Sequence, residues 1–245
     1  MWTNQMLKSN AKQFFRNNYW PCVGVAIVLN FLGSGAFGRT AGLNFDFEYK
    51  TTHTEYAETG MYAGGEEHLL GTLLISGLVI ALLLLIGILF LMFVGNVISV
   101  GGNRFYIENR RKTAPAGLLF FGFNSGNYKN IVKTMFLAEL SVFLWSFLLI
   151  VPGVVKAYEY MMVPFILAEN PGMDTKDVLA LSSRMMTGEK WKAFVLSLSF
   201  LGWYLLSALT CGILWIFYVS PYVNTTYTEL YVYNKSKAYQ EGYIR

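Results

Sequence analysis

The feature that most constrains this sequence is a pair of long apolar runs, at residues 131–150 and 154–168, separated by Val151-Pro152-Gly153. A second proline-containing break, Glu169-Asn170-Pro171-Gly172, follows the second run. Each run is too apolar to be left in water, and proline and glycine interrupt helices. The pattern therefore predicts a helical hairpin inside a lipid bilayer.

Composition favours a membrane protein over a soluble one. Hydrophobic residues make up 54% of the chain and charged residues only 14%, and the mean hydropathy is +0.40. A soluble domain usually has about a quarter charged residues. The apolar residues gather in runs of about twenty, the length that crosses a hydrocarbon core of about 30 Å. We expect an all-α, polytopic transmembrane helix bundle of about six spans with amphipathic interfacial helices and a polar extracytoplasmic loop.

The expected segments follow one another along the whole chain. They are an amphipathic interfacial helix (1–19), a first span (20–37), an acidic extracytoplasmic loop (38–68), a long second span (69–100), a basic cytoplasmic segment (101–130), third and fourth spans (131–150 and 154–168), an amphipathic cytoplasmic helix (173–190), fifth and sixth spans (193–210 and 213–232) and a cytoplasmic tail (233–245). The second span is long enough to be tilted.

The first segment has the pattern of a helix that lies in the headgroup layer. Apolar residues recur at helical spacing, and three cations stand four residues apart on the other side: Trp2, Met6, Leu7, Ala11, Phe14 and Phe15 against Lys8, Lys12 and Arg16. We expect the aromatic face in hydrocarbon and the cations on anionic lipid headgroups. Three cations are too few for a nucleic-acid arm, so we expect no nucleic-acid partner. A signal peptide stays open as an alternative.

The distribution of positive charge predicts the orientation. If the N-terminus is cytoplasmic and six segments cross, sixteen of the 19 lysine and arginine residues lie on the cytoplasmic side. Only Arg39, Lys50 and Lys156 lie outside. Cations are enriched in cytoplasmic loops. We therefore expect a multi-pass protein of the cell membrane with both termini in the cytoplasm.

No motif predicts catalysis or a cofactor. The stretch from Gly33 to Gly38 matches G-x-G-x-x-G but ends an apolar helix, whereas a dinucleotide site requires a strand before it and a helix after it. Glu66-Glu67-His68 has no second ligand pair at fixed spacing, so a solvated acidic loop is expected rather than a metal site. The chain has no His-Glu-x-x-His and no Gly-x-Ser-x-Gly. We expect no cofactor, no metal and no enzymatic activity.

Polar residues inside the expected spans are the candidate functional residues. They are Glu139, Lys156, Glu159, Asn224 and Glu229, and the candidate helix breaks are Pro152, Gly153, Pro164 and Pro221. Such groups normally face the bundle interior or water. Lys156 and Glu159 are three residues apart and can pair. Two hypotheses remain for the carboxylates, structural ion pairs or a proton or ion pathway. The fourth span is predicted to pack inside the bundle against the third and sixth, with Glu139 and Glu229 facing that interior.

Several separated stretches carry a resemblance to a known family. They are the run from Trp145 to Gly153, Lys156-Ala157-Tyr158, the run from Met162 to Pro171, Ser182 to Met186, and Phe200-Leu201-Gly202-Trp203, with similar residues at Leu7 to Lys12 and at Pro221-Tyr222. In this order they resemble the bacterial membrane-protein family known as domain of unknown function 975. The resemblance implies a multi-pass bacterial protein without an assigned activity, and it does not extend to residues 38–68.

The sequence leaves two candidate functions. The first is a membrane scaffold or partner-binding protein of the bacterial cell envelope, in contact with the bilayer and with a membrane-protein partner or a second copy of itself. The alternative is a small transporter or channel that uses the intramembrane carboxylates.

Overall fold

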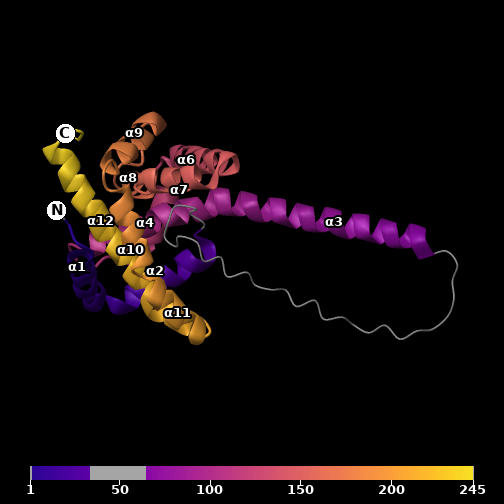
Figure 1. Cartoon of the computed structure of the whole chain (residues 1–245), viewed down its shortest axis with the longest axis horizontal. Helices are drawn as coiled ribbons and strands as arrows, with labels where there is room; N and C mark the ends of the chain where they lie inside the picture. The colour runs from indigo at the N-terminus through magenta and orange to yellow at the C-terminus, as the bar shows by residue number, and fades with distance from the viewer. Residues whose placement is uncertain (1, 34–64, 245) are drawn as a thin grey trace. The chain divides into compact units, whose positions relative to one another are not determined.

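The computed structural model describes residues 2–33 and 65–244, of which 65–72 are described by their backbone alone, and every element in these ranges is helical (Figure 1). The chain forms two compact units. The first comprises Met1–Ala41 and Leu91–Arg245, and the second comprises Gly42–Phe90. Most of the expected acidic loop and most of the glycine-rich stretch at 33–38 lie outside the described residues.

The second unit contributes one described helix, α3 (Gly65–Phe90). From Leu73 onward its side chains are exposed and nearly all aliphatic. A helix that is apolar on every side is typical of a membrane span. The expected span 69–100 also covers residues of the first unit, namely the π-helical turn η1 (Leu91–Gly95) and the start of α4 (Asn96–Asn109). The side chains of α4 are almost all buried.

The first unit begins with α1 (Asn4–Asn17) and α2 (Tyr19–Leu32). Thr3 caps α1, because its hydroxyl oxygen accepts a hydrogen bond from the amide of Met6 at 3.2 Å. The apolar face of α1, formed by Leu7, Ala11 and Phe15, is buried in the protein core and packs along α12. This differs from the expectation of a face in lipid. The reason is that α12 covers this face of α1 in place of lipid.

The predicted hairpin is present as α6 (Tyr128–Leu148), α7 (Ile150–Glu159) and α8 (Val163–Glu169). Its break lies at Leu149 rather than at 151–153, and the run predicted at 154–168 is divided between α7 and α8. Pro152 and Pro164 lie in the first turns of α7 and α8, where a backbone N–H has no partner within the helix, so they begin helices rather than kink them. Two short elements, η2 (Ala116–Phe120) and α5 (Phe121–Asn124), precede the hairpin.

The C-terminal part contains four helices and a π-helical turn: α9 (Thr175–Met185), α10 (Lys190–Leu198), α11 (Leu201–Leu209), η3 (Trp215–Val219) and α12 (Ser220–Gln240). Asp174 caps α9, because its carboxylate accepts a hydrogen bond from the amide of Lys176 at 3.1 Å. Cys211 and Gly212 have positive φ angles of 50° and 82° and turn the chain between α11 and η3. Helix α12 is buried on all sides over most of its length.

Four helices among the described residues are long and apolar enough to cross a membrane: Leu73–Asn109, Tyr128–Leu148, Ile150–Glu169 and Lys190–Leu209. This agrees with a membrane protein. The first and sixth expected spans are not among these four helices. The first lies on Tyr19–Leu32, which is apolar but shorter. The sixth lies on η3 and the first half of α12, where polar residues lower the hydropathy.

Candidate functional site

Helix α12 is a polar helix at the centre of the first unit. Its threonines satisfy their hydroxyl groups within the helix: Thr225, Thr226 and Thr228 donate to carbonyl oxygens four residues earlier at 2.7–2.9 Å. Asn224, a predicted site residue, is buried here, and its carbonyl oxygen accepts the bond from Thr228. Pro221 lies in the first turn of α12. The helix therefore reaches its neighbours mainly through its longer side chains.

Glu229 connects α12 to the C-terminal end of α4 through an ion pair. Its carboxylate is only 4% exposed and contacts Arg110 Nε at 2.6 Å. Asn10 of α1 donates to the other oxygen at 3.5 Å. The Arg110 guanidinium also lies over the ring of Phe14, 5.6 Å from its centroid. The prediction that Glu229 faces the protein interior is consistent with this geometry.

Glu139 lies at a different place from Glu229. Asn96, at the start of α4, donates to the Glu139 carboxylate at 3.1 Å. Arg110, the partner of Glu229, follows the end of the same helix. Fourteen residues of helix correspond to about 21 Å, so the structure does not bring the two predicted carboxylates together in one site.

Glu159 binds two cations that the sequence placed on opposite sides of a membrane. Lys156 Nζ contacts one carboxylate oxygen at 2.7 Å, and Lys190 Nζ contacts the other at 2.6 Å. The predicted pair between Lys156 and Glu159 is present. The prediction that Lys156 lies outside and Lys190 inside is wrong at this site, because two ammonium groups on one carboxylate lie at the same depth.

Glu189 is a buried carboxylate that was not among the predicted residues. Its oxygens accept hydrogen bonds from Trp2 Nε1 at 3.1 Å, Lys192 Nζ at 2.9 Å and Lys237 Nζ at 3.2 Å. Burial alone would raise the pKa of Glu189, but the hydrogen bonds from the two lysines outweigh it and hold the pKa below its usual value of 4.5. Glu189 and Lys192 are three residues apart, and this spacing is the only local sign in the sequence that they form an ion pair.

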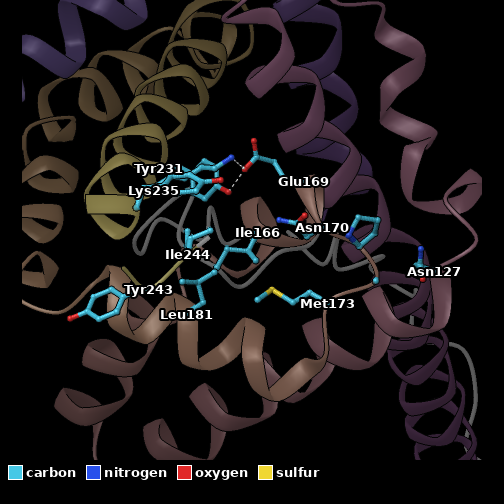
Figure 2. A pocket seen from close by; sticks show the side chains of 13 residues that line it. Asn127, Ile166, Glu169, Asn170, Met173, Leu181, Tyr231, Lys235, Tyr243 and Ile244 are labelled. Atoms are coloured by element: carbon cyan, nitrogen blue, oxygen red, sulfur yellow. Dashed lines mark hydrogen bonds and ion pairs between the residues drawn. The ribbon is translucent and has the colours of Figure 1, made fainter. Parts of the chain in front are cut away.

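Glu169, at the end of α8, is also missing from the predicted residues. Tyr231 donates its hydroxyl and Lys235 its ammonium to the same carboxylate oxygen, each at 2.5 Å (Figure 2). The rings of Tyr231 and Phe165 stack 5.1 Å apart. Arg104 donates to the carbonyl of Ala168 at 3.1 Å and so satisfies the C-terminal end of α8. These contacts hold Glu169 in a fixed place beside α12.

Three hollows meet at Glu169, and we call this surface the Glu169 face. The largest, of about 670 Å³, is lined by residues of α8, α9, α12 and the loops beside them: Asn127, Ile166, Glu169, Asn170, Pro171, Gly172, Met173, Leu181, Tyr231, Lys235, Tyr239, Tyr243 and Ile244 (Figure 2). A second, of about 390 Å³, includes Arg110, Arg111 and Lys235. A third, of about 230 Å³, includes Arg104, Arg111 and Lys112.

The Glu169 face has the chemistry of a binding surface. Its largest hollow has the volume of an ordinary small-molecule site, and Asn130 fixes its rim by donating to the carbonyls of Pro171 and Met173, both at 2.8 Å. Cations outnumber carboxylates around the three hollows. Among the residues whose side chains are described, no group of three or more could hold a metal ion. The side chains of Glu66, Glu67 and His68 lie outside that part of the chain.

Comparison with known proteins identifies the family. No curated protein and no solved structure matches the chain. Residues 61–237, more than two thirds of the sequence, match the family described as Protein of unknown function (DUF975). The match contains both Glu169 and Glu229 and begins near the end of the acidic stretch at 38–68. The chain therefore belongs to the DUF975 family of proteins of unknown function.

Proposed function

We propose that this protein is a non-enzymatic binding protein of the bacterial cell envelope, embedded in the membrane, whose Glu169 face holds anionic phospholipid headgroups. The observation that carries the proposal is the convergence of three hollows on one basic surface. Arg110, Arg111, Lys112 and Lys235 line them, with Glu169 at their junction. Arginine and lysine are the usual partners of phosphate groups.

Two cations of this face are available to a ligand. Arg111 and Lys112 are exposed just beyond α4, and no ion pair among the side chains described in 2–33 and 73–244 includes either of them. Each lysine or arginine near an anionic membrane surface contributes about 1 kcal/mol to its attraction. Exposed cations beside preformed hollows therefore support a headgroup-binding role.

The pairing of the carboxylates supports binding over transport. A proton or ion pathway needs carboxylates that exchange partners, whereas Glu159 holds two lysines and Glu229 holds an arginine at 2.6–2.7 Å. Charges paired in this way stabilise the arrangement of helices. The alternative of a small transporter or channel thus has less support.

The orientation belongs to the same proposal. Both termini lie in the cytoplasm, as the charge asymmetry predicts, and the Glu169 face then meets the cytoplasmic leaflet, where anionic lipids are enriched. Hydropathy alone predicts about six crossings, two of which are the apolar runs 131–150 and 154–168. A membrane-protein partner or a second copy of the chain would bind in addition to lipid.

A lipid-dependent stability measurement tests the proposal. We expect phosphatidylglycerol to raise the unfolding temperature of the purified, detergent-solubilised protein more than phosphatidylcholine does. The double variant Arg111→Gln, Lys112→Gln should lose this difference. The matched control is Lys176→Gln, which removes an exposed cation of α9 that lines none of the three hollows. An equal response to both lipids, or a preference that survives in the double variant, contradicts the proposal.

A further inference from the structure

The turn of the α6–α7 hairpin is apolar on every side. Phe147 is 85% exposed, Ile150 79% and Val151 73%. The nine residues from Phe147 to Val155 include no polar side chain. A hairpin that crossed a membrane would place this turn in water on the far side. Its composition instead matches hydrocarbon.

Both legs of the hairpin are held at their base by one amphipathic helix, α9. The hydroxyl groups of Thr134 on α6 and Thr175 on α9 form a hydrogen bond of 2.8 Å. Seven residues further along α9, Ser182 donates to the carbonyl of Glu159 on α7, also at 2.8 Å. The outer side of α9 has exposed charges at Lys176, Asp177 and Arg184. This helix lies at a polar surface, and the two legs begin at that surface.

The ion pairs of Glu159 also indicate that the base of the hairpin lies at a polar surface. Lys190, at the start of α10, reaches Glu159 from outside the hairpin. Lys156 lies nearer the turn, yet its ammonium extends away from the turn to the same carboxylate. Lysines in membrane proteins direct their charge toward the nearest polar boundary. In a crossing hairpin that boundary would lie beyond the turn, in the opposite direction.

The leg formed by α7 alone, without α8, is too short to cross. Ten residues separate Leu149 in the turn from Glu159, which at 1.5 Å per residue is about 15 Å. The hydrocarbon core is about 30 Å thick. If Glu159 and its two lysines stay at the polar boundary, the turn reaches the middle of the bilayer and no further.

From these observations we infer that the α6–α7 hairpin is re-entrant: it inserts its apolar turn into the hydrocarbon of one leaflet and returns to the face from which it entered. Its partner is thus the acyl-chain region of that leaflet. The hairpin contributes no crossing, so both termini still lie on one side. Lys156 then joins the other cytoplasmic cations, which strengthens the charge asymmetry.

Cysteine accessibility in intact membranes tests the inference. We propose a Leu149→Cys variant of the full chain in a Cys211→Ser background, since Cys211 is exposed and Cys22 is buried. Right-side-out and inverted vesicles are treated with a membrane-impermeant maleimide. We expect no labelling of the Leu149→Cys variant in either preparation and full labelling after detergent is added. Leu149 is 62% exposed, so the substitution leaves the packing intact.

Two further variants make the result decisive. A Thr187→Cys variant, at an exposed position just after α9, should be labelled in inverted vesicles only and marks the face from which the hairpin enters. An Ile150→Cys variant repeats the test at the neighbouring turn position. Labelling of either turn variant in right-side-out vesicles would overturn the inference, because it would place the turn in water across the membrane.

A depth measurement separates lipid from protein as the cover of the turn. A fluorophore attached to the Leu149→Cys variant in proteoliposomes should be quenched most by lipids with a spin label near the end of the acyl chain. A label on the Thr187→Cys variant should be quenched most by a headgroup spin label. Weak quenching of the turn by every acyl-chain label, or strongest quenching by the headgroup label, contradicts insertion into hydrocarbon.

Discussion

Four buried or half-buried carboxylates share one arrangement at the scale of single residues. Glu159, Glu169, Glu189 and Glu229 each accept from at least one lysine or arginine of a different helix or of the segment that follows one. A buried charge is tolerated when a partner and further hydrogen bonds replace its water. These residues therefore connect helices that are distant in sequence, three of them through α12, and their loss has a measurable cost.

The Glu229→Gln variant should be less stable than the wild type. It leaves the Arg110 guanidinium without a counter-charge at a carboxylate position that is 4% exposed, and we expect a loss of roughly 1–3 kcal/mol of unfolding free energy. The matched control is Glu108→Gln, which removes a more exposed pair with Arg104 that contributes roughly 0.5 kcal/mol. Denaturant unfolding in mixed micelles measures both. Equal losses would contradict the structural role of Glu229.

Glu189 predicts an acid-dependent loss of stability. Its pKa in the folded protein lies below the usual value of 4.5 because two lysines stabilise the carboxylate. Its contribution is therefore complete above pH 4.5 and is lost as the pH falls through the lower pKa of the folded state. We expect the difference in unfolding temperature between the wild type and the Glu189→Gln variant to shrink over this interval. A difference that stays constant with pH would show that Glu189 is not ionised.

At the scale of elements, the prolines and the glycine that were predicted to break helices have other roles. Pro152, Pro164 and Pro221 all lie in first turns. Gly153 allows α6 and α7 to approach closely, since a Cβ atom there would lie 2.1 Å from Ser146 Oγ and 2.6 Å from Ser146 Cα. The predicted break at Gly153 is thus a contact point between the two legs.

A Gly153→Ala variant should destabilise the hairpin. The backbone of Ser146 cannot rotate away, so the legs must separate, at a cost of roughly 1–3 kcal/mol. Gly202→Ala is the matched control, because a Cβ atom at Gly202 in α11 meets nothing within 4 Å. Alanine favours a helix over glycine by up to about 1 kcal/mol, so this control should be neutral or slightly more stable. Thermal unfolding of both variants distinguishes a close contact from general helix propensity.

For the whole molecule, the charge asymmetry predicts where its ends lie. A reporter that is active only in the cytoplasm should be active when fused after Arg245 and inactive when inserted within residues 51–65. The physical reason is that cations are retained on the cytoplasmic side during insertion. A reporter that is active only outside should give the reverse pattern. Identical results at both positions would contradict an odd number of crossings between them.

The sequence by itself determines the class of this protein and much of its helical content. Long apolar runs leave helices as the spanning structure, because a helix satisfies its own backbone hydrogen bonds where water is absent. Local spacing also predicted the pair of Lys156 with Glu159, since this contact lies within one helical turn. Family membership was likewise predictable, because several motifs recur in order along the chain.

Only the tertiary structure decided which distant residues meet. Lys190 and Glu159 are 31 positions apart, and Trp2 and Glu189 are 187 apart, so no local period relates them. The Glu169 face arises because the end of α8 lies beside α12, and hydropathy has no information about that contact. Hydropathy also cannot tell a hairpin that crosses a bilayer from one that returns, since both need the same apolar length. The contacts of Glu159 with α9 and α10 are what carry the inference that this hairpin returns.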